Sequence, residues 1–287
     1  MAHFPVLSAE ALELLAIRPD GIYLDATAGL GGHSAEIAKR LTTGRLIAND
    51  RDADSLAQAR ANTAEWAERI LFHQGTFSTL REAVAVAGVR QVHGLLADLG
   101  VSRYQLTSAP RGFSILADGP LDMRMDQSQG MTAGDLVNYA AEKALADLIY
   151  QFGEERRARK IARAIVRARP IRSTLHLAGV VERVAPRTGH LHPATRTFMA
   201  LRIAVNEEQQ ELDALLELAP DLVMSGGRIV IISFMSLEDR KVKQKFRSLA
   251  QEGRVLILTK RPLQPSDNEI YQNAASRSAK LRAVEMN

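Results

Sequence analysis

The sequence contains no cysteine. This absence excludes disulfide bonds, zinc sites built on thiolates and cysteine nucleophiles. Long apolar runs are also missing, since even residues 229–234, apolar apart from Ser233, suit one buried strand and are far too short to cross a bilayer. The N-terminus has no basic segment followed by an apolar one. We therefore expect no secretory signal, no membrane association and a cytoplasmic location.

A strong charge of either sign is missing as well. The net charge is +4 over 287 residues. This mild excess permits a nucleic-acid partner but does not require one. The chain is long enough for one large domain or two smaller ones with a substantial core.

Strand and helix patterns alternate over the first hundred residues. Strands are expected at residues 21–25, 45–50, 70–74 and 92–98, with helices at 34–41, 53–66 and 79–87. This alternation predicts an α/β fold, a parallel sheet with helices on both faces. Residues 107–130 are irregular, and the pattern is helical from Thr132 to about Glu217, with helix starts at Thr132, Ala141, Glu154 and Ser173.

Strand patterns return near the C-terminus. A strand is expected at residues 227–234, a helix at 237–251 and short strands at 254–259 and 279–284. The economical interpretation is one α/β domain, residues 1–106 and 211–287, with an all-helical domain, residues 107–210, inserted between its fourth and fifth strands.

A small-residue loop follows the first expected strand. Residues 24–34 read Leu-Asp-Ala-Thr-Ala-Gly-Leu-Gly-Gly-His-Ser, and Asp50 ends the next strand about twenty residues later. Glycines let a backbone approach a ligand closely, and an acid at that distance can accept both ribose hydroxyls. The acid before the loop, Asp25, disfavours a pyrophosphate and favours the cationic end of S-adenosylmethionine over NAD. A tight turn without a ligand is the alternative.

Three acids, Asp25, Asp50 and Asp98, end expected parallel strands. That edge of an open α/β sheet is where ligands bind, although a single such acid can simply cap a helix. Asp98 is placed to position the donor's ammonium group or the acceptor, and otherwise forms a turn. Phe77, just past the third strand, either packs on an adenine face or is a core aromatic.

Two further segments carry dense charge. Residues 118–126 hold three acids and an arginine, which is consistent with a substrate-facing lid or a plain solvated loop. Arg156, Lys160, Arg163 and Arg167 recur at helical spacing, so this face either contacts phosphates or is only solvated.

Histidines and a possible helix cap complete the candidates. His190 and His192 are two residues apart, but no third ligand is evident, so we expect no metal. A polar segment facing RNA or another domain is favoured there, with Arg196 among its donors. Ser236 is expected to cap the next helix, with Asp239 completing a capping box.

Taken together, these segments resemble the bacterial small-subunit ribosomal RNA cytosine-N4 methyltransferases, the MraW/RsmH family. The resemblance covers nearly the whole chain. The matching segments are His3–Leu7, Asp25–Ser34, Asp50–Asp52, Asp98–Ser102 with Gln105, Arg111–Ser114, Asp118–Asp126, Phe152–Arg156, Lys160–Ile165, His192–Phe198, Arg202–Asn206, Ser236–Arg240 and Ser276–Arg282.

The resemblance implies a Rossmann-like class I methyltransferase sheet with an inserted helical domain. It implies S-adenosyl-L-methionine as cofactor, and methylation of the exocyclic N4 of a cytidine in the decoding region of 16S ribosomal RNA. The small ribosomal subunit is the implied partner, with the protein a monomer or a homodimer. Donor contacts carry over to Gly31, Gly32, His33, Asp50, Phe77, Asp98 and Gln105.

The catalytic and RNA-binding residues are expected as follows. Asp98 is the leading orienting group, with Asp122 and Asp126 as weaker candidates. RNA contacts are expected at Arg156, Lys160, Arg163, Arg167, His192 and Arg196.

The chain departs from the family pattern in places. Met235 stands where the family usually has His, Ala274-Ala275 replaces a usual Pro-Arg, and Arg103-Tyr104 replaces a usual Ser-x. Methionine cannot donate a conventional hydrogen bond or act as a base. These changes motivate a competing interpretation, a donor-binding ribosome assembly factor that has lost turnover. A methyltransferase acting on small molecules or DNA would explain the sheet but not the matches in the insert.

Overall fold

The computed structural model describes residues 5–185, 187 and 191–287. Two sequence observations, on His3 with Phe4 and on His190, lie outside the described residues. The chain forms two compact units, one of Met1–Gly100 with Gln209–Asn287 and one of Val101–Glu208. These limits differ by a few residues from the sequence expectation. Within the described ranges, no helix has the length and apolar character that crossing a membrane requires.

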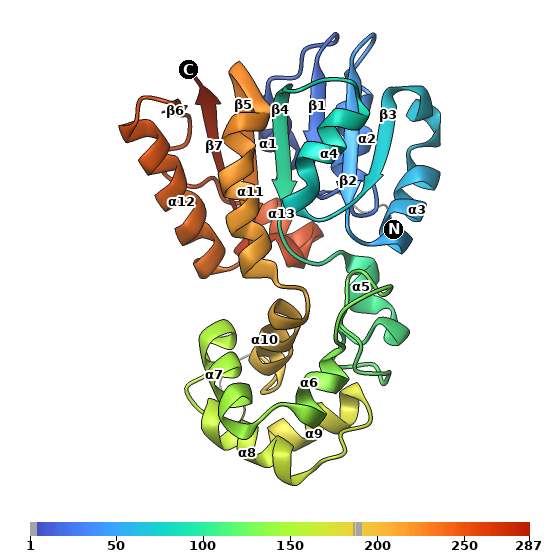
Figure 1. Ribbon diagram of the computed structural model, residues 1–287, viewed down its shortest axis with the longest axis vertical. Helices are drawn as coiled ribbons and strands as arrows, with labels where there is room; N and C mark the ends of the chain where they lie inside the picture. The colour runs from blue at the N-terminus through green and yellow to red at the C-terminus, as the bar shows by residue number, and fades with distance from the viewer. Residues whose placement is uncertain (1–4, 186, 188–190) are drawn as a thin grey trace. The chain divides into compact units, whose positions relative to one another are not determined.

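The first unit is built on a seven-stranded sheet (Figure 1) with the order β3-β2-β1-β4-β5-β7-β6. Neighbouring strands from β3 to β5 are parallel, whereas β7 runs antiparallel to both β5 and β6. The strands are β1 (Ile22–Asp25), β2 (Arg45–Asp50), β3 (Ile70–Gln74), β4 (Val92–Asp98), β5 (Val223–Ser233), β6 (Val255–Ile257) and β7 (Lys280–Met286). This order confirms the Rossmann-like methyltransferase sheet.

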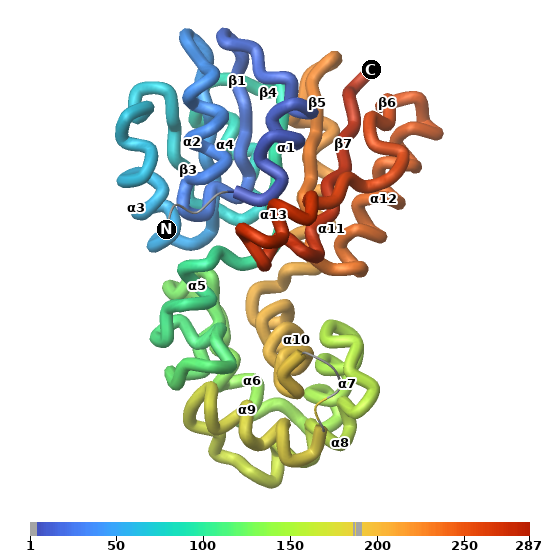
Figure 2. Tube along the Cα trace, turned by 180° about the vertical axis from the view of Figure 1, so that it is seen from behind, coloured from blue at the N-terminus to red at the C-terminus, as the bar shows by residue number. Residues whose placement is uncertain are grey.

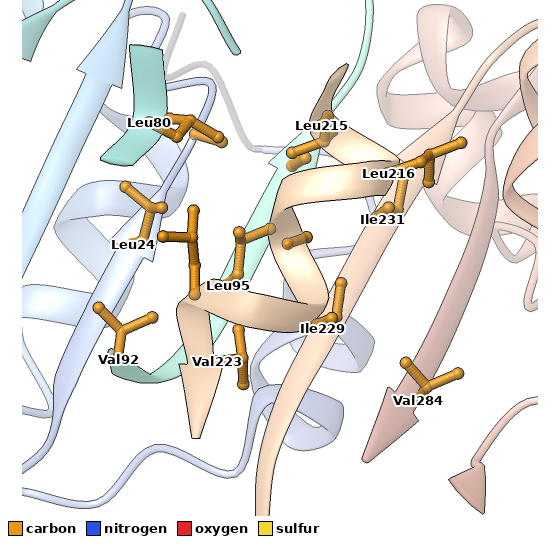
Figure 3. Packing of buried hydrophobic residues seen from close by; sticks show 14 of the residues in the cluster. Leu24, Leu80, Val92, Leu95, Leu215, Leu216, Val223, Ile229, Ile231 and Val284 are labelled. Atoms are coloured by element: carbon orange, nitrogen blue, oxygen red, sulfur yellow. The ribbon is translucent and has the colours of Figure 1, made fainter. Parts of the chain in front are cut away.

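Alternation along the strands separates two apolar layers. In β4, Leu95 belongs to one buried cluster and Leu96 to the other, because successive side chains point to opposite faces. Figure 3 shows the first cluster, in which Leu95 and Ile231 pack with Leu215. Helices α4 (Leu80–Val86), α11 (Glu208–Leu222) and α12 (Ser236–Gln251) contribute to this cluster. Helices α1 (Ser8–Leu15), α2 (Gly32–Ala38) and α3 (Ala53–Asn62) contribute to the other.

Short elements complete the first unit. Helix α13 (Asp267–Gln272) precedes β7, and Figure 2 shows it from behind. The 3-10 turns are η1 (Ala64–Arg69), η2 (Phe77–Thr79) and η4 (Ala274–Ser278).

The second unit is helical around its own apolar cluster, to which Leu145, Ile161 and Leu177 belong. Its helices are α5 (Arg103–Thr107), α6 (Ala133–Tyr139), α7 (Glu142–Gly153), α8 (Ala158–Arg167), α9 (Thr174–Glu182) and α10 (Thr195–Val205), with the 3-10 turn η3 (Ala109–Arg111). Asn206 ties the irregular segment to α10, because its side chain accepts from Met125 N at 2.7 Å and donates to Met123 O at 2.7 Å.

Two expected helix starts were wrong. Glu154 does not begin a helix: it ends α7 in the left-handed conformation, with φ of 49°, and α8 starts only at Ala158. Ser236 is the first residue of α12 and not its cap. The cap position is Met235, and Glu238, not Asp239, accepts from the backbone N–H groups of Phe234 and Met235, both at 3.0 Å. Asp239 instead forms an ion pair with Arg282.

Candidate functional site

Asp25 organises the loop that follows β1. Its carboxylate accepts the Thr27 N–H at 3.1 Å and the Ser34 hydroxyl at 2.6 Å, and it is 1% exposed. The Thr27 hydroxyl in turn accepts the backbone N–H of Asp98 at 2.6 Å. Burial raises the pKa of Asp25, and the opposing effects of His33, Ser34 and Thr27 do not cancel it. The ends of β1 and β4 are thus joined through one short side chain.

The glycines of this loop are required by conformation and by space. Gly31 has φ of 87°, and a Cβ there would lie 3.0 Å from the Thr63 methyl group and 3.2 Å from Ala59 Cα. Gly29 has φ of 52° and donates its N–H to Asp50 at 2.8 Å. Gly32, the first residue of α2, approaches Pro5, where a Cβ would lie 3.3 Å from the ring. Side chains would therefore strain this loop or displace its neighbours.

Asp50 ends β2 at the same edge of the sheet. One carboxylate oxygen accepts from Gly29 N, and the other accepts from Asp52 N at 2.9 Å. Each oxygen keeps a second lone pair for a hydroxyl donor. Burial raises the pKa of Asp50 to about 6, although both backbone hydrogen bonds oppose the shift.

His33 and Asp98 contain buried polar atoms that have no hydrogen-bond partner among the described residues. The His33 ring is 5% exposed, and neither ring nitrogen forms a hydrogen bond with a described residue. Its Nε2 lies 3.6 Å from Asp98 Oδ2, too far for a hydrogen bond but close enough for strong attraction. Asp98 Oδ1 also has no partner among the described residues. Burial lowers the pKa of His33, but the Asp98 and Asp25 carboxylates outweigh it, so the pKa is raised.

Unpaired buried polar atoms are costly, and their concentration at this edge indicates a ligand that supplies the missing partners. An ammonium group fits the free Asp98 oxygen, and ribose hydroxyls fit Asp50. The glycine loop between Gly29 and Gly32 allows a ligand to approach the backbone closely. These residues therefore fit S-adenosyl-L-methionine.

The remaining expected donor contacts are Phe77 and Gln105. Phe77 is the first residue of η2. It is partly buried and packs against the apolar cluster that contains Leu95 and Leu215, as its alternative role of a core aromatic predicts. Gln105 belongs to the second unit. It is 3% exposed and completes a capping box with Ser102, accepting the Ser102 N–H at 2.8 Å.

The strand order, the glycine loop and the acids on the carboxyl edge define a class I methyltransferase that uses S-adenosyl-L-methionine. The MraW methylase family model matches residues 1–287. The chain belongs to that family, and the family prediction is confirmed.

The chain is also similar to curated relatives over almost its full length. It is 70% identical over 284 residues to "Ribosomal RNA small subunit methyltransferase H" of Solibacter usitatus, covering 99% of each chain. A protein of the same name from Koribacter versatilis is 50% identical, with 99% of this chain and 93% of the relative covered. The protein of that name from Acidobacterium capsulatum is 49% identical, with 99% and 98% covered.

Basic residues of the second unit gather around a hollow of about 800 Å³. We call it the basic hollow; its described lining consists of Tyr150, Gln151, Glu154–Arg157, Ala185, Leu191–Pro193 and Arg196. Arg156, His192 and Arg196, three of the six expected RNA contacts, are thus brought together. Tyr150 is 64% exposed at its rim. Arg196 donates to Glu154 O at 3.1 Å and lies 4.0 Å from the Glu155 carboxylate.

The other three expected RNA contacts lie along α8. Ile161 and Ile165 are buried on one side of this helix, while Lys160, Arg163 and Arg167 are exposed. Arg163 lies 3.4 Å from the exposed carboxylate of Glu142. Since an exposed pair of this kind contributes little, Arg163 stays available to a phosphate.

Asp122 and Asp126 organise their own loop. Two Arg124 nitrogens bond the Asp122 carboxylate, at 2.8 and 3.0 Å, and Gln127 adds a third bond at 3.0 Å. Burial raises the pKa of Asp122, but the bonds from Arg124 and Gln127 prevail, so the pKa is lowered. Asp126 accepts from Ser128 N–H and hydroxyl and from Gln129. A carboxylate of lowered pKa is a poor proton acceptor, so the local geometry favours a structural role for Asp122.

Two residues that organise this edge of the sheet, Asn49 and Thr27, were not predicted from the sequence. Asn49 donates to Ala26 O at 3.2 Å and Gly75 O at 3.0 Å, joining the loops after β1 and β3. An amide within an otherwise apolar strand was the available signal. Among the described residues, no group of three or more His, Asp or Glu side chains is arranged to hold a metal ion.

Proposed function

We propose that the chain transfers a methyl group from S-adenosyl-L-methionine to the exocyclic N4 of a cytidine in the decoding region of small-subunit ribosomal RNA. The single observation that carries the donor half is the pair of unsatisfied buried groups, His33 and Asp98, beside the glycine loop. The RNA half is supported by the names of the relatives and by the exposed cations of the second unit.

The proposed donor site uses residues already at the edge of the sheet. Asp50 accepts the ribose hydroxyls, Asp98 accepts from the donor's ammonium group, and His33 is held by its attraction to Asp98. The bound donor supplies an electrophilic methyl group on a cationic sulfur. The full proposed set of donor contacts is Gly31, Gly32, His33, Asp50, Phe77, Asp98 and Gln105.

The acceptor amine needs help from the protein. Its lone pair is delocalised into the cytosine ring, so in-line attack requires close positioning and a proton acceptor. Asp98 is our proposed orienting group; Asp122 and Asp126 stay weaker candidates. The segment after β4 reads Asp98-Leu-Gly-Val, unlike the Asn/Asp-Pro-Pro-aromatic loop of other amino-methyltransferases. The base must leave its stack to reach the proposed donor site.

The second unit is the proposed RNA-recognition domain. Its exposed cations suit phosphates, and reading by shape is the usual mode for structured RNA. The proposed contacts are Arg156, Lys160, Arg163, Arg167, His192 and Arg196.

Methyl transfer itself tests the proposal. Purified small ribosomal subunits lacking the modification are incubated with the protein and tritium-labelled donor, and the product nucleosides are separated. We expect label in N4-methylcytidine at a single position. Label in another nucleoside would overturn the proposed acceptor.

Met235 motivates the second candidate, a donor-binding assembly factor without turnover. Intact donor binding in the absence of transfer would favour it. A Met235→His variant that restored transfer would locate the defect at this position.

A further inference from the structure

A second basic hollow lies in the first unit, and its lining contains none of the proposed donor or RNA contacts. It occupies about 480 Å³ between α12, β6 and β7. We call it the α12–β6 hollow. The labels α12 and β6 lie at one edge of the sheet in Figure 1, where β6 is the terminal strand.

Cations surround an apolar floor in the α12–β6 hollow. Lys243 and Arg247 are one turn apart on α12, and Lys260 follows β6. Phe246 and Val255 are 4% exposed and form the floor, and the lining contains no Asp or Glu.

None of the three cations, Lys243, Arg247 and Lys260, forms an ion pair with a described residue. By contrast, the neighbouring lysines of α12 are paired: Lys241 with Asp213 at 2.7 Å and Lys245 with Glu217 at 2.7 Å. Arg282, also in the lining, is fixed by Asp239 at 2.6 Å and is not counted.

We propose that the α12–β6 hollow is a second RNA-backbone site, in which Lys243, Arg247 and Lys260 bind consecutive phosphates of the ribosomal RNA. This inference rests on the proposed function for the identity of the polyanion. Free cations around an acid-free hollow match a phosphate chain, and the apolar floor can accept ribose or base edges. The site contributes affinity and register, and takes no part in donor binding.

Protection of a sheet edge is the competing explanation. Lysine and arginine beside a short terminal strand prevent pairing with another chain. Leu256, in the middle of β6, is 57% exposed, so this edge strand presents an apolar side chain to other chains. This explanation predicts self-association, and not weaker RNA binding, when the cations are removed.

The test compares two triple variants of equal charge change. Lys243→Gln/Arg247→Gln/Lys260→Gln removes the hollow's cations; Lys39→Gln/Arg45→Gln/Arg90→Gln removes three exposed cations elsewhere in the first unit. Binding to a labelled 20-nucleotide single-stranded RNA and to purified small ribosomal subunits is measured across salt concentrations. Donor binding and sedimentation establish that each variant is folded and monodisperse.

We expect the first triple variant to bind both RNA probes at least about tenfold more weakly at low salt. The slope of log affinity against log salt for the 20-mer falls by about 2, since each phosphate contact on a single strand contributes about 0.7. The control triple variant keeps most of the wild-type slope. Equal behaviour of the two variants, self-association with an unchanged slope, or absence of RNA binding by the wild-type protein would each overturn the proposal.

The two proposals fail separately. Wild-type protein that binds RNA through this hollow but transfers no methyl group would sink the proposed function and leave the α12–β6 hollow standing. Full methyl transfer by the wild-type protein, with no effect of the first triple variant on RNA binding, would overturn the α12–β6 hollow as an RNA site and leave the proposed function standing.

Discussion

His33 and Asp25 are almost wholly buried beside the glycine loop of the first unit, whereas Arg156 and Arg196 of the second unit are exposed around the basic hollow. The buried group has fixed hydrogen bonds and leaves specific atoms unsatisfied. The exposed arginines have few fixed partners, and what they have in common is their positive charge. A buried site should therefore respond sharply to one substitution, and an exposed one gradually to several.

The largest expected effect is that of Asp98→Asn. The change removes the carboxylate that we propose faces the donor's ammonium group, and a lost charge-assisted hydrogen bond of about 1.5–3 kcal/mol weakens binding about 10- to 100-fold. Calorimetric titration with S-adenosyl-L-methionine measures this change. Asp147→Asn, an exposed residue of the second unit, serves as control and should leave donor affinity unaltered. Equal losses in both variants would break the contrast between buried and exposed groups.

Asn206→Ala tests whether the stability of the second unit also depends on a buried polar residue. Asn206 is 1% exposed, and the change leaves Met125 N–H and Met123 C=O without this partner. We expect a loss of about 2 kcal/mol in the free energy of unfolding. Urea denaturation followed by circular dichroism measures it, with the exposed Asn268→Ala as control. Wild-type stability in Asn206→Ala would show that these bonds are replaced by water.

The pH dependence of donor affinity tests the buried site at Asp50. Its pKa is raised to about 6, and in the proposed donor site its ionised form accepts the ribose hydroxyls. Donor affinity should therefore fall about tenfold from pH 7.5 to pH 5, since the carboxyl is mostly protonated one unit below its pKa. Asp50→Asn should bind more weakly at pH 7.5 and lack this part of the pH dependence. Any contribution from His33 or Asp25 stays in both proteins, so parallel profiles would contradict the assignment.

The smallest expected effect belongs to the basic hollow. Arg156→Gln/Arg196→Gln should weaken RNA binding only about fivefold at moderate salt and lower the salt slope by about 1.4. Filter binding across salt concentrations measures both quantities, and donor affinity should not change. Arg172→Gln/Arg183→Gln is the matched control from the same unit. A loss as steep as that of Asp98→Asn would mean that these arginines make specific contacts.

The sequence predicted the first unit well because its periodicity is strong. The expected strands at residues 45–50, 70–74 and 92–98 coincide with β2, β3 and β4. Helix starts were harder where several cap residues compete: Glu154 has helix propensity but takes the left-handed conformation that ends α7. Capping of α12 was misread because Glu238, inside the helix, supplies the bonding group.

Long-range hydrogen bonds were beyond the sequence. The bond from Asp98 N to Thr27 joins residues 71 positions apart, and no local pattern encodes it. The same holds for the meeting of Arg156 with His192 and Arg196, since it depends on how α7, α8 and α10 pack. Periodicity predicts which face of a helix is buried, but not which distant helix covers it.

The first unit is assembled from two stretches of chain separated by Val101–Glu208, and this has a consequence for biosynthesis. When β4 leaves the ribosome, its neighbour β5 has not been made, so Leu95 lacks the α11 and β5 side chains of its cluster. At about 5–20 residues per second, the gap lasts several seconds or longer. The helical unit is therefore the first part that can fold completely, and the nascent sheet must wait with an open edge until the C-terminal strands arrive.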